Sequence, residues 1–185
     1  MASSENASAF SSLFKEAIIE YKNVLQIDPK DANAHYKLGL FHLRVEQFRE
    51  AYPEFLKSIE LAPDLIDARL QLGSLYLLSR NPQKAKEQAE LVIAKSPNNT
   101  SGHLLMSSIY VAEKDLDKAI SEAKRVIEMD PKKIEAYLHL ANLYVLKKDF
   151  GQAEQTLKEA IKVDPNSTRA RYVLGNFYLR MGKRE

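Results

Sequence analysis

Apolar residues recur at three- and four-residue spacing along most of the chain, a pattern that predicts amphipathic helices. The first such stretch runs from about Ser12 to Ile27, and similar stretches follow it to the end of the sequence, separated by short polar or proline-containing breaks. We therefore expect helices over about 12–27, 32–44, 48–61, 66–79, 82–95, 101–113, 116–129, 134–147, 150–163 and 169–181.

Five prolines divide the chain at a constant interval. Pro29, Pro63, Pro97, Pro131 and Pro165 are each 34 residues apart. Proline stops a helix because it lacks an N–H and its ring clashes with the preceding turn. A fixed period of this length is that of a helix-turn-helix unit, which has to stack on its neighbours to bury its apolar face.

The units between the prolines share residue types at fixed offsets. An alanine stands 22 residues after each of the first four prolines, at Ala51, Ala85, Ala119 and Ala153. Small side chains at such places let two helices approach closely. A second small position, ten residues after each proline, is occupied by Gly39, Gly73, Ser107, Ala141 and Gly175.

Several polar residues are placed to cap helices. Asn81, Asp115 and Asp149 each precede an apolar stretch, where a side-chain oxygen accepts a hydrogen bond from a free backbone amide. Pro82 follows Asn81 and suits the first turn of a helix, where no N–H is needed.

These positions resemble those of tetratricopeptide-repeat (TPR) proteins over about residues 12–182. The aromatic residue usual six places after proline is present only as Tyr137. The resemblance implies an all-α fold, a right-handed superhelical α-solenoid of helix-turn-helix repeats. The expected single array has a half repeat at 12–31, full repeats at 32–65, 66–99, 100–133 and 134–167, and a half repeat at 168–185. Residues 1–11, which lack apolar periodicity, are expected to be a disordered leader.

Both terminal helices of the expected array keep an apolar face. Complete arrays normally end in a helix with a polar outer face. We therefore expect either a piece of a longer bacterial or archaeal array, or a homo-oligomer formed through the unpaired terminal helices.

Composition narrows the classes of partner. The chain has 27 Lys and Arg against 25 Asp and Glu, intermixed along the sequence, so neither nucleic acid nor an anionic membrane is expected to bind it. No cysteine is present, which excludes disulfides and cysteine-based metal sites. The sequence shows neither a signal segment nor an apolar run of about 18 residues. The sequence does not distinguish a cytoplasmic from a periplasmic location.

No group of titratable residues has the spacing of an active site. His35 and His42 are seven residues apart, and His103 and His139 lie in other units, whereas metal-binding pairs on a helix are three or four residues apart. We expect His35 and His103 to fill the aromatic position between helices, and His139 to face solvent. Phosphate-binding and nucleophile-elbow motifs are missing from the sequence. The sequence thus predicts no enzyme, no catalytic residue, no cofactor and no metal.

A partner-binding groove is what the resemblance implies for the first helices of the repeats, which line a concave face in such proteins. An apolar trough edged by polar side chains suits an amphipathic helix or an extended peptide, and Asn142 and Asn176 would bind a peptide backbone through their amides. The predicted groove residues are Tyr36, Leu40, Leu43, Leu70, Ser74, Leu77, Leu104, Ser108, Val111, Leu138, Asn142, Val145, Tyr172, Asn176 and Leu179.

The predicted function is that of a protein-protein interaction scaffold that binds a protein or peptide segment. The carboxylate clamp of TPR domains that bind the acidic tails of heat-shock chaperones is missing, because Tyr or Leu occupies its first lysine place, seven residues after proline, in every unit. Two alternatives stay open. One is a self-assembling unit of a bacterial envelope or exopolysaccharide-export lipoprotein, whose repeats this chain resembles in style. The other is a docking module of a larger enzyme.

Overall fold

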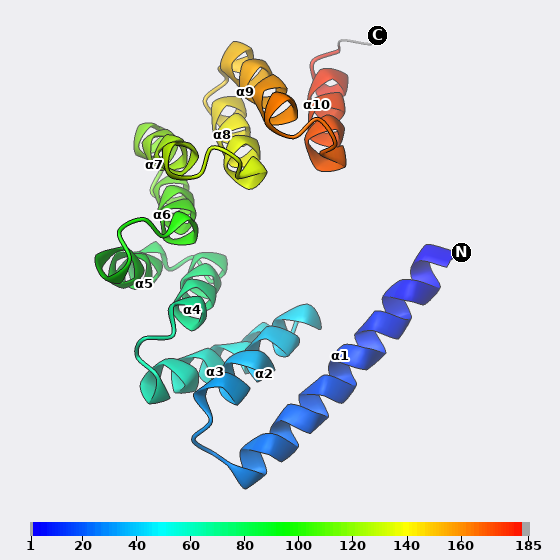
Figure 1. Cartoon of the computed structure of the whole chain (residues 1–185), viewed down its shortest axis with the longest axis vertical. Coiled ribbons are helices and arrows are strands. Elements are labelled where there is room, and N and C mark those ends of the chain that lie inside the picture. Colours follow the sequence, from blue (N-terminus) through cyan, green and yellow to red (C-terminus); the bar gives the residue numbers. More distant parts are fainter. Residues whose placement is uncertain (1, 183–185) are drawn as a thin grey trace. The chain divides into compact units, whose positions relative to one another are not determined.

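The computed structural model describes the backbone of residues 2–182 and the side chains of residues 12–182, and this part of the chain contains ten α-helices and no strand. Figure 1 shows them in order along the chain. They are α1 (Ala2–Ile27), α2 (Ala32–Arg44), α3 (Phe48–Leu61), α4 (Ile66–Leu78), α5 (Pro82–Lys95), α6 (Thr100–Ala112), α7 (Leu116–Met129), α8 (Ile134–Leu146), α9 (Phe150–Val163) and α10 (Thr168–Arg180).

Nine of the predicted helices agree with the structure to within one residue at each end. The exception is α1, which begins at Ala2 instead of near Ser12. Residues 2–11 therefore continue the helix and do not form the predicted disordered leader. This stretch contains neither glycine nor proline and three of its residues are alanine, so its backbone propensity permits a helix without an apolar stripe.

The predicted caps form at three helix starts. The side-chain Oδ1 of Asn81 accepts a hydrogen bond from the amide of Lys84 at 3.2 Å. Asp115 and Asp149 accept in the same way from residues three places on, each at 3.1 Å. Each cap satisfies one of the amides that a helix start leaves without a partner.

The turn inside each repeat has a left-handed residue. Glu46, Arg80, Lys114 and Lys148 have φ between 59° and 64°, and Gly182 has φ 71°. These residues are again 34 apart. In the fourth of these turns the Lys148 amide donates to the Val145 carbonyl at 3.0 Å, and the next amide donates to the Tyr144 carbonyl at 2.9 Å. This pair of bonds is the Schellman ending of a helix.

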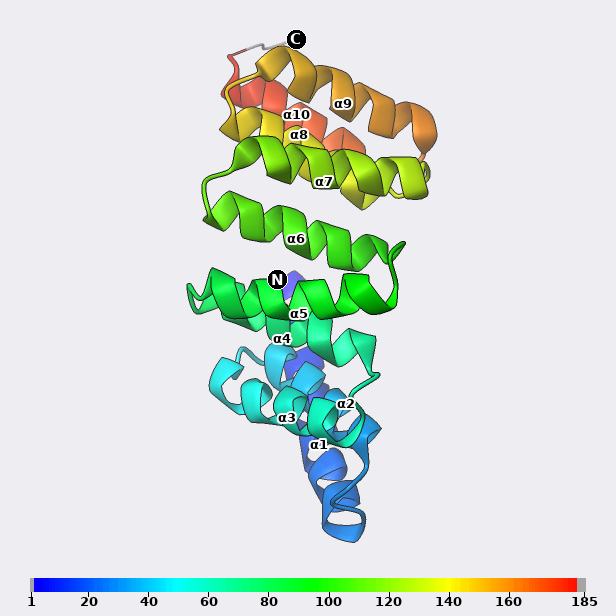
Figure 2. The same cartoon turned by 90° about the vertical axis from the view of Figure 1, so that its left-hand side faces the viewer.

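The chain divides into two compact units, Met1–Gln88 and Ala89–Glu185, at a point within α5. In the first unit α1 packs on α2, α2 on α3 and α3 on α4. In the second unit each helix from α6 to α10 packs on the next, as Figure 2 shows, and α10 also contacts α8. Each unit has its own apolar cluster, centred on Phe55 in the first unit and on Leu143 and Leu157 in the second.

Small residues sit where the helices approach most closely. Ala51, Ala85, Ala119 and Ala153 are all fully buried. A Cβ added to Gly39 would lie 2.7 Å from the Phe55 ring, closer than a van der Waals contact. The alanine column and Gly39 therefore mark close helix contacts, as predicted, whereas Gly175 in the second column is exposed.

Candidate peptide-binding groove

The residue six places after each proline bonds back to that proline. Tyr137 donates from its hydroxyl to the Pro131 carbonyl at 3.0 Å, and Nε of Arg69 donates to the Pro63 carbonyl at the same distance. Arg171 donates to the Pro165 carbonyl through Nε and Nη2. His35 and His103 place Nε2 at 3.2 Å and 2.9 Å from the carbonyls of their own prolines.

In three repeats the same side chain also reaches the second helix of its repeat. The Nδ1 atom of His35 lies 2.6 Å from Oε2 of Glu54, and that of His103 lies 2.6 Å from Oε2 of Glu122. Arg69 donates to Oε1 of Gln88 at 3.2 Å. The two partners are always 19 residues apart. His35 and His103 thus fill the position between helices, as predicted, and each ties both helices of its repeat together.

His139 departs from its predicted place in solvent. It is only partly exposed, and its Nε2 lies 2.8 Å from Oγ of Ser107. The Ser107 hydroxyl donates to the Ala119 carbonyl at 2.7 Å, so it accepts from the His139 ring. Burial lowers the pKa of His139, which keeps the ring neutral and Nε2 protonated. The prediction was wrong because Ser107, alone among the small residues at this position of the repeat, offers a hydroxyl oxygen to the His139 ring.

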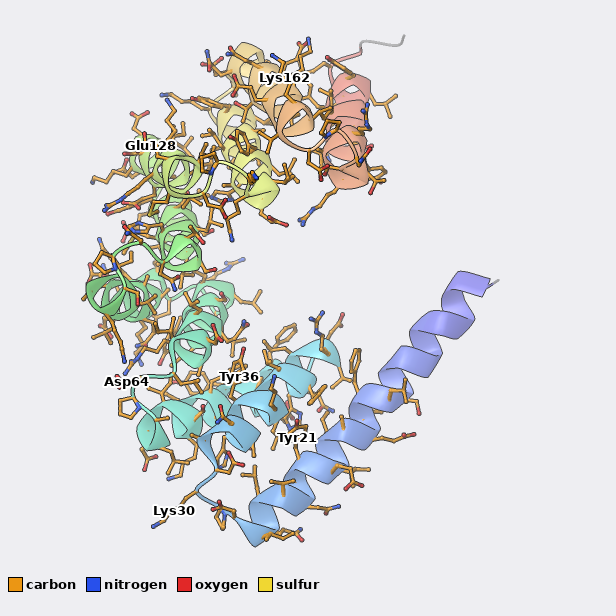
Figure 3. All side chains as sticks on the ribbon, viewed as in Figure 1. Tyr21, Lys30, Tyr36, Asp64, Glu128 and Lys162 are labelled. Atoms are coloured by element: carbon orange, nitrogen blue, oxygen red, sulfur yellow. The ribbon has the colours of Figure 1, made fainter. Side chains whose placement is uncertain are left out.

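In the first unit the predicted groove residues take part in packing. Tyr36, Leu40 and Leu43 on α2 pack partly against the Phe55 cluster, and Tyr36 is labelled in Figure 3. The ring of Tyr36 lies 6.1 Å from that of Phe55, and burial, with Asp67 nearby, raises the pKa of its hydroxyl. On α4, Leu70 and Leu77 are partly buried beside an exposed Ser74, whose hydroxyl donates to the Leu70 carbonyl.

In the second unit the predicted residues border two hollows. The first hollow, of about 460 Å³, lies over α6, α8 and α10. Its lining combines apolar side chains with the charged Glu135 and Arg169, and Nη1 of Arg169 lies 4.0 Å from Oε1 of Glu135. Both of these side chains are largely exposed. The residues that line the first hollow are Leu104, Glu135, Leu138, His139, Asn142, Arg169 and Val173.

The second hollow, of about 400 Å³, continues from the first along α8 and α10 and reaches α9. The two hollows share Leu138, Asn142 and Val173, so one apolar surface with an amide at its centre runs through both. The second adds Asn176 and Arg180 as polar groups. The residues that line it are Leu138, Ala141, Asn142, Val145, Phe150, Leu157, Val173, Asn176, Phe177, Arg180 and Met181.

Five of the nine predicted residues in the second unit line these hollows: Leu104, Leu138, Asn142, Val145 and Asn176. Ser108 and Val111 are partly buried, and Ser108 donates to the Leu104 carbonyl at 3.0 Å. Tyr172 and Leu179 are 71% and 67% exposed and line neither hollow. The prediction did not include Val173, which lies eight residues after Pro165 and contributes to both hollows.

A separate pocket of about 610 Å³ in the first unit was not predicted. It lies between α3 and α4, and its most prominent feature is a pair of tyrosines. The hydroxyls of Tyr52 and Tyr76 are 3.0 Å apart, and their rings meet edge to face. Burial and this bond raise the pKa of Tyr76 to about 12. The lining residues are Phe48, Arg49, Tyr52, Leu75, Tyr76, Leu78, Ser79 and Asn81.

The corresponding place two repeats later has an ion pair. Lys147 and Asp117 stand 68 residues after Ser79 and Arg49, and Nζ of Lys147 lies 2.6 Å from Oδ1 of Asp117. Serine does not reach across in this way, so the pocket in the first unit stays open. A sequence comparison of repeats could have flagged Tyr52, because the matching residues are Lys86, Ile120 and Glu154.

Within the described residues, no three His, Cys, Asp or Glu side chains come together as metal ligands would. None of the described helices combines the length and the apolar character needed to cross a bilayer.

The helices thus define an all-α solenoid of helical hairpins. Family models described as tetratricopeptide repeat match residues 110–171 and 32–65, and a model described as TPR repeat matches residues 14–45. The chain is a tetratricopeptide-repeat protein. A search of the curated proteins finds no match.

Solved structures of TPR proteins have the same fold. MamA from Desulfovibrio magneticus is 20% identical, with 89% of this chain and 96% of that chain covered and a TM-score of 0.71. TTC0263 from Thermus thermophilus is 23% identical, with 82% of this chain and 84% of that chain covered and a TM-score of 0.72. YrrB is described as a TPR protein with an unusual peptide-binding site. It is 24% identical, with 90% of this chain and 87% of that chain covered and a TM-score of 0.63.

Proposed function

We propose that this chain is a non-catalytic scaffold that binds a peptide or helix of a partner protein in the joined hollows of α6, α8 and α10. Proteins built of TPR repeats are generally interaction scaffolds, which agrees with this class. The observation that carries the proposal is that the two hollows share Leu138, Asn142 and Val173, so that apolar side chains and the amides of Asn142 and Asn176 line one continuous depression.

The chemistry of this surface favours a segment with apolar anchors. Burial of each Leu-sized anchor contributes about 1.5–3 kcal/mol, and the amides of Asn142 and Asn176 each offer a donor and an acceptor to a peptide backbone. YrrB, which shares this fold, has a peptide-binding site of its own. Arg169, Glu135 and Arg180 at the edge would select the charge of residues flanking the anchors.

The test is selection of a displayed random peptide library against the purified chain, followed by direct binding of the enriched peptides. Asn142→Ala combined with Asn176→Ala should weaken binding about tenfold or more, and Leu104→Glu should abolish it, because the peptide would bury a charge. The matched control is Leu91→Glu on α5, a half-exposed leucine outside both hollows. Enriched peptides that bind all variants equally would contradict the proposal.

A further inference from the structure

The two terminal helices carry complementary halves of one repeat. We propose that copies of this chain associate head to tail, with α10 of one copy packing against α1 of the next to form a composite repeat. This inference goes beyond the peptide groove and uses another face of α10.

The template for the composite repeat is the pair α2 and α3 in the first unit. There His35 on α2 contacts Glu54 on α3, and Gly39 on α2 lies directly against the Phe55 ring. The 34-residue period places Arg171 and Gly175 of α10 at the positions of His35 and Gly39. The same period places Glu20 and Tyr21 of α1 at the positions of Glu54 and Phe55.

The face of α10 that would receive a second helix is open in the described residues. A Cβ added to Gly175 would meet no atom within 4 Å, whereas the same addition at Gly39 would overlap an aromatic ring. Gly175 itself is exposed, whereas Leu174 and Tyr178 beside it pack against the core of their own unit. An aromatic side chain from another helix therefore has room above Gly175, as Phe55 has above Gly39.

The matching face of α1 is half covered. The Tyr21 ring lies 5.4 Å from that of Phe41 on α2, and Figure 3 shows Tyr21 between these two helices. Its side chain nevertheless remains partly exposed, and Val24 one turn later is 39% exposed. Phe55, at the equivalent position in α3, is fully buried because helices cover it on both sides.

Charge complementarity identifies the occupant as a second copy. In three of the four full repeats, the residue six places after proline pairs with the one 19 places further on: His35 with Glu54, Arg69 with Gln88 and His103 with Glu122. Arg171 bonds to its proline carbonyl like the others. Glu20, whose described contact is a 3.5 Å hydrogen bond from Asn23, is an acidic residue at the partner position. Arg171 and Glu20 thus supply opposite charges at the two ends of the chain.

The composite repeat joins two different surfaces, so copies add one after another and form an open filament or a closed ring. Sedimentation velocity of the purified chain should show a mass that rises with concentration beyond that of a dimer. A monomer mass at every concentration would overturn the proposal.

Gly175→Leu separates association from folding. The substitution has room within one copy but would fill the space that Tyr21 of the next copy needs, so it should weaken association at least tenfold with helicity retained. The matched control is Gly151→Leu, an exposed position on α9 with only Asp149 Oδ1 near its Cβ, at 3.9 Å. It should associate like the parent. Equal association of the parent and the Gly175→Leu chain would overturn the proposal.

A charge exchange tests the pairing of Arg171 with Glu20. Arg171→Glu alone and Glu20→Arg alone each place like charges together and should weaken association about tenfold. An equimolar mixture of the two variants restores opposite charges at the junctions between unlike chains and should associate more strongly than either variant alone. A mixture as weak as the separate variants would show that these residues do not meet and would overturn the proposed register.

Discussion

In four of the turns within the repeats, a residue other than glycine has a positive φ. Glycine adopts this left-handed backbone conformation at a lower energetic cost. At Lys114, φ is 64°, a conformation that costs an L-residue roughly 1–2 kcal/mol. Gly182 shows that the period admits glycine at this position. The strain is local, because the hydrogen bonds of the turn are formed by backbone atoms.

Lys114→Gly should stabilise the chain by about 0.5–1 kcal/mol, since relief of the left-handed strain exceeds the added freedom of the unfolded chain. Urea unfolding followed by circular dichroism measures the change. Ala112→Gly, two residues earlier in the last turn of α6, is the control. It should destabilise by up to about 1 kcal/mol because the backbone there is helical. A loss of stability in both variants would contradict the explanation.

His139 makes stability depend on pH. Burial lowers its pKa, so the unfolded chain binds this proton more tightly than the folded chain does. The contribution of His139 to stability is present above its usual pKa of about 6.5 and is lost as pH falls through the lower, folded value. His139→Gln keeps a donor for Ser107 but does not titrate. Unfolding free energies at about pH 7.5 and 5.5 should therefore differ less in the variant than in the parent. An unchanged difference would assign the dependence to other groups.

At the scale of the helices, the glycine ten residues after proline is required by packing in one repeat and has free space around it in another. Gly39→Ala forces a Cβ to within 2.7 Å of the Phe55 ring, whereas Gly175→Ala meets nothing within 4 Å. We expect the first variant to lose about 1–3 kcal/mol through overpacking. The second should gain up to about 1 kcal/mol through helix propensity. Thermal unfolding at low protein concentration, where association does not contribute, measures both. Equal effects would contradict the difference in packing.

The ends of the helices were predictable because they are punctuated by proline and by capping side chains. The period also predicted α3 to continue through Pro53, which it does, although proline normally ends a helix. The start of α1 was missed because residues 2–11 have helix propensity without apolar periodicity.

The columns seven, eleven and fourteen residues after proline were predicted to form a groove. How much of each side chain packs within the array depends on neighbours in three dimensions, as the buried Leu138 and the exposed Tyr172 show.

At the scale of the whole chain, repetition makes departures from the repeat informative. The polar pair that ties most repeats together is replaced by Tyr137 and Thr156 in one of them, where Thr156 donates to its own helix. The pocket of Tyr52 and Tyr76 lies where Ser79 replaces a longer side chain. Position-by-position comparison of the repeats therefore separates residues that maintain the fold from those available for another role.

Head-to-tail association also predicts a stability that depends on protein concentration. Anything that binds the folded chain and not the unfolded chain stabilises it by mass action, and each composite repeat adds such binding. The midpoint of thermal unfolding, Tm, should therefore rise as the parent is concentrated over about two orders of magnitude, by a few degrees if association reaches the micromolar range. Gly175→Leu should have the same Tm at every concentration, although its monomer remains folded, and Gly151→Leu should follow the parent. A Tm of the parent that does not change with concentration would mean that α1 and α10 do not gain stability from each other, and the open face of α10 would then need a different occupant.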